Sequence, residues 1–546
     1  DEYAEEMADR VREGIVTVRR TMHIEQGALQ RVDAPDQTWV KSPEGWTKLD
    51  PDAQTLSGGQ GSALRSGSRQ NARLGSGEKL RADKHLPDIA ALIDPEQFEL
   101  ITGPQSGVVV LRGAAGTGKT TVALHRIAYL CYAHPRQFPA SQILVVVWGR
   151  AMRDYVAHVL PALGVEGVQV TTWEHWARKQ VRRHYPRLPQ AISDDTPEPV
   201  VRIKLHPSIA EALARLSAEN PKDRSPDTAL EDWGRLITDR TLIAKAMGDD
   251  ISEQALDRAM AWCTKQWNAV SAWWDGERDV DARLDPEDDA LLLRAWQMRV
   301  GPLRSHKKQP MQTAHMVLDE VQDFSPIEVQ VLLETTSKLR SVTLAGDTRQ
   351  HITQHAGFDS WSDFLQRIGV ASTALNTLAV SYRSTHPITQ FAVSVLEDEQ
   401  APARTLRDGP PVELFRFSDH GACVAFLATT LRKLTDTEAL ANVAVLTPDE
   451  SLADIYFDGL HSAEVPDVRR VRGQRFAFKP GIDVVPAKEI KGLEFDYVIV
   501  VEASAEYWKD TAHHRRLMHV AATRAVHQLW LTSVGTPSPI LPKAGT

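Results

Sequence analysis

The chain has 546 residues, a formal net charge of −9 and a pI near 6.1. This length is too great for a single hydrophobic core and predicts about three to four domains. The negative charge excludes a uniformly basic nucleic-acid coat, although a local basic cleft stays compatible with it. No apolar run approaches the ~20 residues of a membrane-spanning helix, and no signal peptide is apparent. With three scattered cysteines that lack metal-ligand spacing, we expect a cytoplasmic protein and no membrane partner.

Residues 1–84 are predicted to form an N-terminal helical region followed by a flexible linker. Apolar residues at helical spacing in residues 1–32 indicate one or two helices. Residues 33–48 contain a Ser-Pro-Glu-Gly turn between tryptophans, which is typical of a small hairpin. Residues 51–78 are rich in Gly, Ser, Gln and Arg, a composition that predicts a mobile linker.

A phosphate-binding loop is predicted at Gly113–Thr120, whose sequence Gly-Ala-Ala-Gly-Thr-Gly-Lys-Thr fits the pattern G-x-x-x-x-G-K-[ST]. An apolar strand pattern precedes it at Val108–Leu111, and a helical pattern follows at Val122–Tyr132. A glycine-rich turn without function is the alternative, and the strand–loop–helix context disfavours it.

The residues of this loop have separate expected roles. Its glycines let backbone N–H groups point at phosphates beside a helix N-terminus; these are Gly113, Gly116 and Gly118. Lys119 is expected to reach the β- and γ-phosphates, and the Thr120 hydroxyl to bind Mg²⁺. Thr121 completes the predicted nucleotide contacts on this segment. The expected cofactors are therefore ATP and Mg²⁺.

Strand and helix patterns alternate after the loop, at 142–147, Met152–Leu163 and Val168–Thr172, which predicts a parallel doubly wound α/β sheet. Residues 174–312 break this rhythm. They are mostly helical in pattern and carry many acids and seven tryptophans, so we expect an inserted helical domain. The tryptophans form either an ordinary core or a partner-binding surface.

A second nucleotide element follows the strand pattern Met316–Asp319. Asp319 is expected to hold Mg²⁺ through water, and Glu320 to orient or activate the attacking water. The alternative is an acidic helix N-terminus without catalytic function. Upstream of the phosphate loop, the Gln97 amide can both donate to and accept from an adenine edge, which makes it a candidate for base recognition.

Further candidates lie in the C-terminal half. Gln350, just after the strand Ser341–Asp347, is placed to sense a γ-phosphate. Tyr382 can stack on adenine and Arg383 can clamp the γ-phosphate, although a Tyr-Arg pair alone is usually a surface feature. Arg524 is expected to act as a second arginine across a domain cleft. A basic run either tracks phosphates or is merely solvated; it comprises Arg469, Arg470, Arg472, Arg475 and Lys479.

Taken in order, seven stretches resemble the motifs of superfamily 1A motor ATPases, the UvrD/Rep/PcrA-like helicases. They are Asp94–Gln97, Gly113–Thr120, Asp319–Asp323, Gly346–Gln350, Tyr382–Thr385, Lys491–Asp496 and Ala522–Ala525. The resemblance implies two RecA-like domains with ATP between them and with Arg383 and Arg524 spanning the cleft. It also implies that Tyr382 stacks on adenine and that Glu494 contacts ribose or nucleic acid.

The implied domain order divides the chain into four parts. An N-terminal region covers 1–84, and the first RecA-like domain covers 85–173 with 313–380. A helical insertion, 174–312, is expected to be an arm for a partner or for nucleic acid. The second RecA-like domain, 381–546, is expected to lack the large insertion that unwinding members carry, because too few residues separate Thr385 from Lys488.

Within the family the sequence is more similar to the HelD branch, whose members bind bacterial RNA polymerase. Ala123–Leu130, Leu86–Gln97 and Tyr155–Trp173 carry that similarity. It implies that ATP turnover remodels or recycles RNA polymerase and releases bound nucleic acid. The run His351–Gly357 lacks the Trp or Tyr on which processive members stack bases, which also favours a non-processive ATPase. Against this branch, residues 1–80 are short for its long helical arm.

Two other functions are compatible with the sequence. One is a 3′→5′ DNA helicase or translocase in repair or phage defence, which binds single-stranded DNA. The other is a binding module in which ATP acts as a conformational latch with little turnover.

Overall fold

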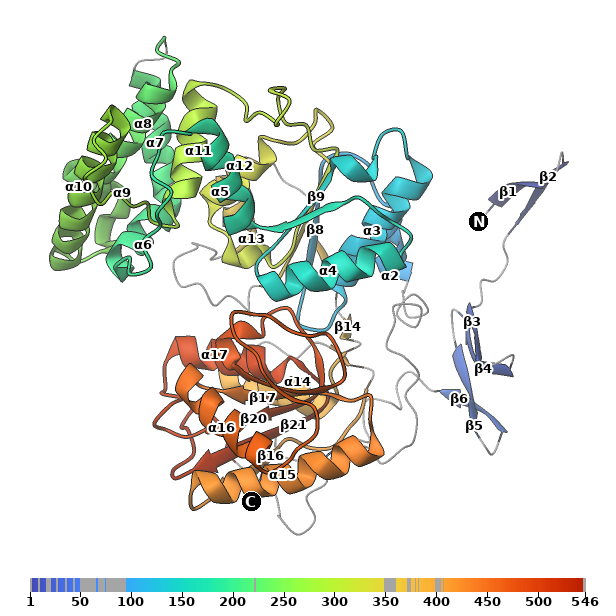
Figure 1. The fold of residues 1–546 in the computed structure, drawn as a ribbon. Coiled ribbons are helices and arrows are strands. Elements are labelled where there is room, and N and C mark those ends of the chain that lie inside the picture. Colours follow the sequence, from blue (N-terminus) through green and yellow to red (C-terminus); the bar gives the residue numbers. More distant parts are fainter. Residues whose placement is uncertain are drawn as a thin grey trace.

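The computed structural model describes residues 2–7, 10–15, 21–25, 28–34, 37–42, 45–49, 65–66, 74, 95–219, 222–347, 360–370, 375–378, 380–381, 383–397, 404–405 and 407–543. Within these, two parallel sheets with helices on their faces form two lobes, one above the other in Figure 1. The predicted α/β fold class is confirmed. We call the lobe that contains the phosphate loop the first lobe and the other the second lobe.

The first lobe is built on a six-stranded sheet in the order β10-β9-β11-β12-β8-β13, with every neighbouring pair parallel. Its strands are β8 (Val108–Gly113), β9 (Ile143–Val147), β10 (Gln169–Thr172), β11 (His315–Leu318), β12 (Val342–Gly346) and β13 (Leu375–Leu378). The helices around it are α2 (Pro95–Thr102), α3 (Lys119–Ala133), α4 (Arg150–Ala162), α12 (Pro326–Leu333) and α13 (Trp361–Arg367), with 3-10 turns at Ala140–Gln142 and Val321–Asp323.

Both faces of this sheet are covered, which is why its strands read as continuous apolar runs. Successive side chains of a strand point to opposite faces. Thus Leu111 and Val145 pack with α3 and α4, whereas Val110 and Leu144 belong to a core that faces the opposite side. The sheet therefore holds the ends of its strands rigidly, and those ends position the candidate site.

Residues between β10 and β11 form a helical insertion, at the far left in Figure 1. Its helices are α5 (Trp173–His184), α6 (Glu198–Leu205), α7 (Pro207–Glu219), α8 (Pro226–Thr238), α9 (Arg240–Met247), α10 (Glu253–Asp275) and α11 (Asp288–Arg299), with a 3-10 turn at Gly248–Asp250. The insertion shares one continuous hydrophobic core with a face of the first sheet.

The seven tryptophans of the insertion belong to this core. Trp176, Trp233, Trp274 and Trp296 are buried, and Trp262, Trp267 and Trp273 pack against the same cluster while partly buried. The ordinary-core interpretation of the tryptophans is therefore the one that the structure supports.

The second lobe contains a seven-stranded parallel sheet in the order β18-β19-β17-β20-β21-β16-β7. Its strands are β7 (Arg65–Ser66), β16 (Glu413–Phe417), β17 (Asn442–Thr447), β18 (Val468–Arg470), β19 (Gly481–Pro486), β20 (Phe495–Val500) and β21 (Ala525–Val534). Its helices are α14 (His386–Leu396), α15 (His420–Thr437), α16 (Glu450–Ser462) and α17 (Ala512–Ala522), with a 3-10 turn at Ala487–Glu489. A short pair, β14 (Val380–Ser381) and β15 (Arg404–Thr405), lies beside it.

Part of the predicted linker is integrated into this lobe. β7 adds a parallel edge strand beside β16, and Leu74 is buried among the side chains that cover the sheet. A composition rich in Gly and Ser gave no sign of these two contacts, because backbone pairing at an edge needs no particular side chain.

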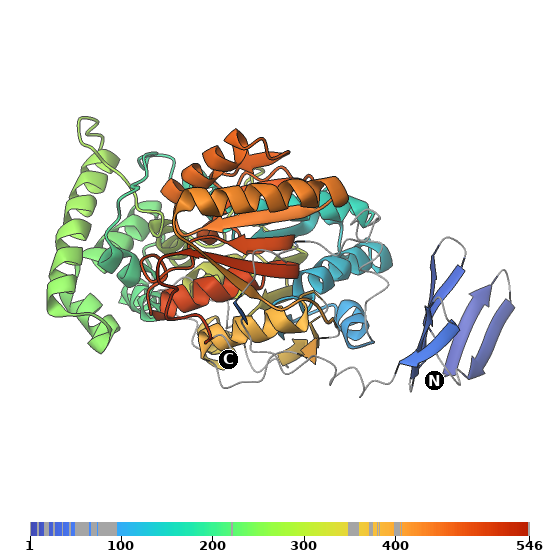
Figure 2. The same cartoon turned by 90° about the horizontal axis from the view of Figure 1, so that it is seen from below.

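The prediction of N-terminal helices is wrong. Described residues of this region form β1 (Glu2–Met7), β2 (Arg10–Ile15), β3 (Thr21–Glu25), β4 (Ala28–Ala34), β5 (Gln37–Ser42) and β6 (Gly45–Leu49), all paired antiparallel. Apolar residues four apart, as at Met7, Val11 and Ile15, satisfy a strand's period of two as well as a helix turn. The predicted hairpin at 33–48 is confirmed by the β5–β6 pair, and Figures 1 and 2 both show these strands beside the lobes.

A buried ionic network joins the helices of the insertion. The Lys204 ammonium on α6 donates to Asp285 Oδ2 at 2.6 Å and to Gln266 Oε1 at 2.8 Å, and lies 2.6 Å from Asp288 Oδ1. The side chains of Lys204, Asp285 and Asp288 are 0% exposed. Trp233 Nε1 also donates to Asp288 Oδ1 at 3.1 Å, so four helices meet at this network.

We expect Lys204→Met to destabilise the insertion by about 3–5 kcal/mol, because it leaves two carboxylates buried without their cation. Urea denaturation followed by tryptophan fluorescence reports on this region, where seven of the chain's 14 tryptophans lie. Arg215→Ala is the matched control, since Arg215 pairs with Glu211 at the surface and is 62% exposed, and it should change stability by less than about 1 kcal/mol. Equal midpoints for Lys204→Met and the wild type would contradict this account.

Candidate nucleotide site

The phosphate loop connects the end of β8 to the start of α3, and its glycines meet geometric demands. Gly116 and Gly118 have φ values of 77° and 83°, in the left-handed region that favours glycine. Gly113 is limited by space, because a Cβ there would lie 2.4 Å from Thr117 Oγ1 and 2.9 Å from the Leu378 carbonyl oxygen. The loop thus keeps its backbone close to whatever it encloses.

Lys119 and its neighbours line this loop. Lys119 is buried, and its ammonium donates to the carbonyl oxygens of Gly113 and Ala114, both at 2.9 Å. This places the cation at the mouth of the loop, beside the N-terminal amides of α3, where a phosphate group is favoured. Thr121 lies half-buried in the first turn of the same helix.

Thr120 and Asp319 meet at the carboxyl ends of β8 and β11. Thr120 Oγ1 donates to Asp319 Oδ2 at 2.7 Å, and Asp319 is buried. A hydroxyl and a carboxylate are oxygen ligands of the kind that Mg²⁺ prefers, so the pair fits this ion. Within the described ranges no cluster of three or more His, Cys, Asp or Glu ligands is found, so phosphates and water would complete the coordination.

Glu320 is held in an uncommon backbone conformation. Its φ of 55° lies in the left-handed region, which costs energy for a side chain of this size. Its N–H donates to Asp319 Oδ1 at 3.0 Å, and Gln322 Nε2 donates to its carboxylate. Gln322 Oε1 in turn accepts from the Asp347 N–H at 3.0 Å, so the ends of β11 and β12 together fix the Glu320 side chain.

The pKa values of the adjacent Asp319 and Glu320 carboxyls are shifted in opposite directions. Burial and the neighbouring Glu320 carboxylate raise the pKa of Asp319. Burial also acts to raise the pKa of Glu320, but Lys491, Lys119 and Arg524 together outweigh it and hold that pKa below its usual value. Glu320 is therefore ionised at neutral pH, as a group that accepts a proton from water must be.

Second-lobe cations complete this acidic cluster. Lys491 pairs with the buried carboxylate of Asp323, and its ammonium lies 3.9 Å from Glu320 Oε2. Arg524 is buried and donates to the carbonyl oxygens of Val520 at 3.2 Å and Leu493 at 3.3 Å. Burial lowers the pKa of Arg524 to about 10, with Glu320 opposing that shift, so the guanidinium stays charged at neutral pH.

Sequence reasoning assigned no role to Lys491, Asp323 or Gln322, although each lies in or beside a motif stretch. Lys491 and Asp323 lie far apart in the chain, and no local sequence pattern predicts that they form an ion pair. The signal available was the run of acids at Asp319–Asp323, which demands a compensating cation once it is buried.

Of the remaining predicted site residues, Arg383 and Gln97 are among those that the structure describes. Arg383 forms an ion pair with Glu494 of the same lobe rather than with Glu320. Gln97 on α2 is buried and its amide donates to the Thr117 carbonyl oxygen at 3.2 Å, against the phosphate loop. Gln350 and Tyr382 lie outside the described residues, as does the run His351–Gly357.

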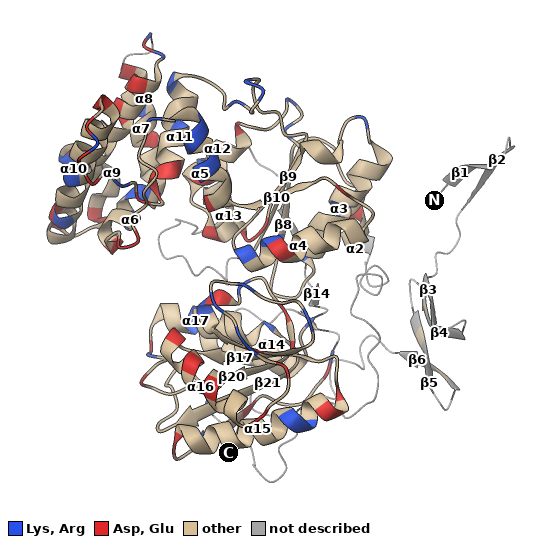
Figure 3. Ribbon diagram, in the orientation of Figure 1, with Lys and Arg blue, Asp and Glu red and all other residues tan. Residues whose placement is uncertain are grey.

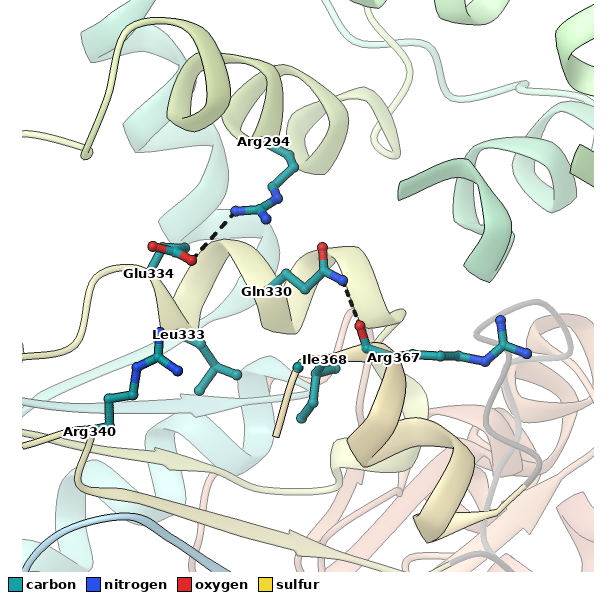
Figure 4. A pocket seen from close by; sticks show the side chains of 8 residues that line it. Arg294, Gln330, Leu333, Glu334, Arg340, Arg367 and Ile368 are labelled. Carbon is teal, nitrogen blue, oxygen red and sulfur yellow. Dashed lines mark hydrogen bonds and ion pairs between the residues drawn. The ribbon is translucent and has the colours of Figure 1, made fainter. Parts of the chain in front are cut away.

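Two cavities in the described part of the chain lie at different places relative to the phosphate loop. One of about 20 Å³ lies between the loop residues Ala114 and Ala115 and the second-lobe residues Ser384 and Thr523. A larger one, about 180 Å³, is lined by residues of α11, α12 and α13 and by Arg340, which precedes β12 (Figure 4). Because β8 and β12 are parallel, this larger cavity lies at the sheet edge opposite the phosphate loop.

The predicted basic run divides into paired and unpaired residues. Arg469 donates to Asp483 at 2.8 Å, while Arg470 and Arg472 donate to Asp454 at 2.7 and 2.8 Å. These three arginines are therefore engaged within the second lobe. In the described part of the chain, Arg475 and Lys479 are exposed and form no ion pair.

Two family models and several proteins named as DNA helicases match this chain. A family model described as an AAA domain matches residues 97–356, and a model described as the UvrD-like helicase C-terminal domain matches residues 482–532. The ATP-dependent DNA helicase UvrD2 of Mycobacterium tuberculosis is 28% identical over 413 residues, which are 71% of this chain and 56% of that protein.

Two Escherichia coli proteins are also similar. DNA helicase IV is 23% identical over 521 residues, 82% of this chain and 69% of that protein. DNA helicase II is 24% identical over 407 residues, 71% of this chain and 53% of that protein. The chain thus spans about half the length of UvrD2 and of DNA helicase II, and 69% of DNA helicase IV. Their names do not support the HelD assignment or an RNA polymerase partner.

Among the described helices, none combines the length and apolarity that crossing a membrane requires.

We expect Gly113→Ala to weaken binding of a fluorescent ATP analogue in the presence of Mg²⁺ by about tenfold or more, equivalent to 1.4 kcal/mol. The added methyl would overlap Thr117 Oγ1 and the Leu378 carbonyl and so move the loop. Gly421→Ala is the control, since a Cβ there meets only the Asp419 side chain at 3.2 Å, on the second lobe. Unchanged affinity in Gly113→Ala would show that the loop does not enclose the phosphates.

Proposed function

Since the chain belongs to the UvrD-like helicases of superfamily 1A, a family of ATP-hydrolysing enzymes, we propose that it is a Mg²⁺-dependent ATPase that translocates along or unwinds DNA. The observation that carries this proposal is the buried cluster in which first-lobe carboxylates meet second-lobe cations. A site that needs both lobes couples nucleotide chemistry to their relative movement. The same cluster speaks against a mere ATP latch, because it holds an ionised carboxylate for water activation.

Each residue of the cluster has a proposed role. Lys119 and the loop amides bind the β- and γ-phosphates, and Gln97 recognises adenine. A Mg²⁺ ion held by Thr120 and Asp319 would neutralise charge on the phosphate oxygens. Glu320 accepts the proton of the attacking water, and Gln322 keeps its carboxylate oriented.

The second lobe supplies the charges that respond to the γ-phosphate. Arg524 and Arg383 would stabilise negative charge that develops on the transferring phosphoryl group. Arg383 must leave Glu494 to do so, or act while paired with it. Tyr382 is proposed to stack on adenine, and Gln350 to sense the γ-phosphate. Glu494 is proposed to contact ribose or nucleic acid.

DNA is the proposed substrate because the relatives with which this chain aligns are named DNA helicases. This is the alternative that the sequence left open, with 3′→5′ movement, and it replaces RNA polymerase as the target. The four domain boundaries expected from the sequence are part of the same proposal, with the insertion 174–312 as a nucleic-acid arm.

Single-stranded DNA should raise the steady-state ATPase rate many-fold, and Lys119→Ala should lower the stimulated rate by about a hundredfold or more, because a phosphate-binding cation is lost. The rate is measured by phosphate release with and without an oligonucleotide. Gly421→Ala on the second lobe, where an added Cβ meets only the Asp419 side chain, serves as the control and should behave as wild type. Retained ATP turnover in Lys119→Ala would refute the assignment of the nucleotide site. An ATPase rate that does not respond to single-stranded DNA would refute DNA as the substrate.

Glu320→Gln should keep ATP affinity but lower the hydrolysis step by about 10²–10⁴-fold, the usual contribution of a general base. The amide cannot accept the proton of water, yet it can still receive the hydrogen bond from Gln322. Nucleotide titration and single-turnover hydrolysis separate the two effects. If both affinity and rate fell together, the role of Glu320 would be to bind rather than to activate water.

A further inference from the structure

The cavity of about 180 Å³ between α11, α12, α13 and Arg340 lies where the helical insertion meets the amino edge of the first sheet. We call it the edge cavity. Arg294 of α11 lines it from the insertion, and Arg340, which precedes β12, lines it from the sheet. Leu333 of α12 and Ile368 after α13 give it an apolar side. A single water needs only about 10–15 Å³ of such free volume, so the edge cavity has room for a small ligand.

Arg294 brings a guanidinium to the edge cavity without a full set of acceptors. Its side chain is only 18% exposed, and one terminal nitrogen lies 3.9 Å from Glu334 Oε1. The same nitrogen donates to Gln297 Oε1 at 3.4 Å, which is also a long contact. Within the described residues, the Arg294 Nε is buried and has no hydrogen-bond partner. Because a buried donor without an acceptor is costly, an oxygen-rich ligand in the cavity would stabilise this side chain.

Arg340 is held in a strained backbone conformation on the opposite side of the cavity. Its φ of 45° lies in the left-handed region, which a glycine would occupy without strain. Its N–H donates to the Ser337 carbonyl oxygen at 2.9 Å and closes the turn before β12. The Arg340 side chain is exposed and forms no ion pair in the part of the chain that the structure describes. The turn itself does not require an arginine, so the charge of this side chain calls for an explanation.

The carbonyl groups that could attract a cation to the edge cavity are already engaged. The last carbonyls of a helix carry partial negative charge, and both α12 and α13 end at this cavity. The Arg367 carbonyl oxygen at the end of α13 accepts from Gln330 Nε2 at 2.7 Å. The Leu333 carbonyl oxygen at the end of α12 accepts from the Thr336 N–H at 3.1 Å. The groups left to bind a ligand are therefore mainly guanidinium donors.

The charges at the edge cavity favour an anion. The Arg367 guanidinium donates to Asp363 Oδ2 at 2.6 Å, and its side chain points away from Arg294 and Arg340 (Figure 4). The basic and acidic residues of the whole chain are marked in Figure 3. Glu334 is the acid that lines the cavity, and its side chain is 50% exposed. Arg294 and Arg340 thus outweigh Glu334 by one positive charge.

We propose that the edge cavity binds a small phosphate-type dianion between Arg294 and Arg340. Two guanidinium forks on opposite sides suit a tetrahedral oxyanion, which presents oxygens in several directions, whereas one fork already satisfies a planar carboxylate. Leu333 and Ile368 offer an apolar contact to a short carbon body beside the phosphate. The ligand is therefore inorganic phosphate or a small phosphomonoester. This site is separate from the nucleotide site, which lies at the opposite edge of the same sheet.

A ligand in the edge cavity would join two parts of the first lobe. Arg294 belongs to the insertion, whereas Arg340 lies just before β12. At the other end of β12, the Asp347 N–H donates to Gln322 Oε1 at 3.0 Å in the nucleotide site. A dianion that contacts both arginines therefore connects the insertion to a strand that ends at the nucleotide site.

The test titrates the full chain with inorganic phosphate, glycerol 3-phosphate or acetate in a calorimeter at constant ionic strength. Excess Mg²⁺ and a non-hydrolysable ATP analogue keep the phosphate loop occupied. We expect the wild type to bind one phosphate compound and to bind acetate far more weakly. The tighter of the two phosphate compounds identifies the source of the dianion. Arg294→Gln and Arg340→Gly should each weaken its binding by about tenfold or more, because charge-assisted hydrogen bonds are lost.

Three further measurements separate binding from folding. Arg340→Gly relieves the left-handed strain, so it should unfold at a temperature no lower than the wild type while it loses the ligand. Glu334→Gln removes the carboxylate that competes for Arg294 and should tighten binding severalfold. Arg472→Ala is the matched control, since it removes a 66% exposed arginine paired with Asp454 on the second lobe, and it should bind as the wild type does.

Two results would contradict the proposal. If the wild type takes up neither phosphate compound, the edge cavity holds only water. If Arg294→Gln and Arg340→Gly bind the phosphate compound as tightly as the wild type, the dianion binds elsewhere. Neither result would bear on the proposed ATPase activity, because the nucleotide site shares no residue with the edge cavity.

Discussion

The buried ion pair between Lys491 and Asp323 is the contact on which the candidate site depends. Asp319, Glu320 and Asp323 lie together at the end of one strand and are all buried. Burying several carboxylates without cations is too costly for a folded protein, because the desolvation of each charge amounts to several kcal/mol. The first lobe provides Lys119, and the second provides Lys491 and Arg524. Charge balance in the site is therefore complete only when the two lobes meet.

The two sheets meet at opposite ends of their strands. In the first lobe the functional residues follow strands: Gly113 ends β8, Asp319 follows β11 and Asp347 follows β12. In the second lobe they precede strands, because Lys491 comes before β20 and Arg524 comes before β21. The carboxyl edge of one parallel sheet thus faces the amino edge of the other. This arrangement places the acids, the phosphate-binding amides and Lys119 on one side, and Lys491 and Arg524 on the other.

The insertion is not a separate body. Its tryptophans share a hydrophobic core with the face of the first sheet opposite α3 and α4. Side chains such as Val110 and Leu144 belong to strands that end at the nucleotide site and also to that core. A close-packed interior conveys displacements with little loss. Residues 471–480, in contrast, make their contacts with α4 across the boundary of the lobes.

The local signals in the sequence determined the phosphate loop, the buried strands and the α/β class, because continuous apolar runs and loop glycines have few other structural uses. Spacing alone misled at the N-terminus, where residues four apart suit strands as well as helices and antiparallel pairing decided the outcome. Only the tertiary structure paired Lys491 with Asp323, set Arg383 against Glu494 and brought Phe478 to His158. Those contacts join residues far apart in the chain, and their energies arise from burial and charge balance that no local pattern encodes.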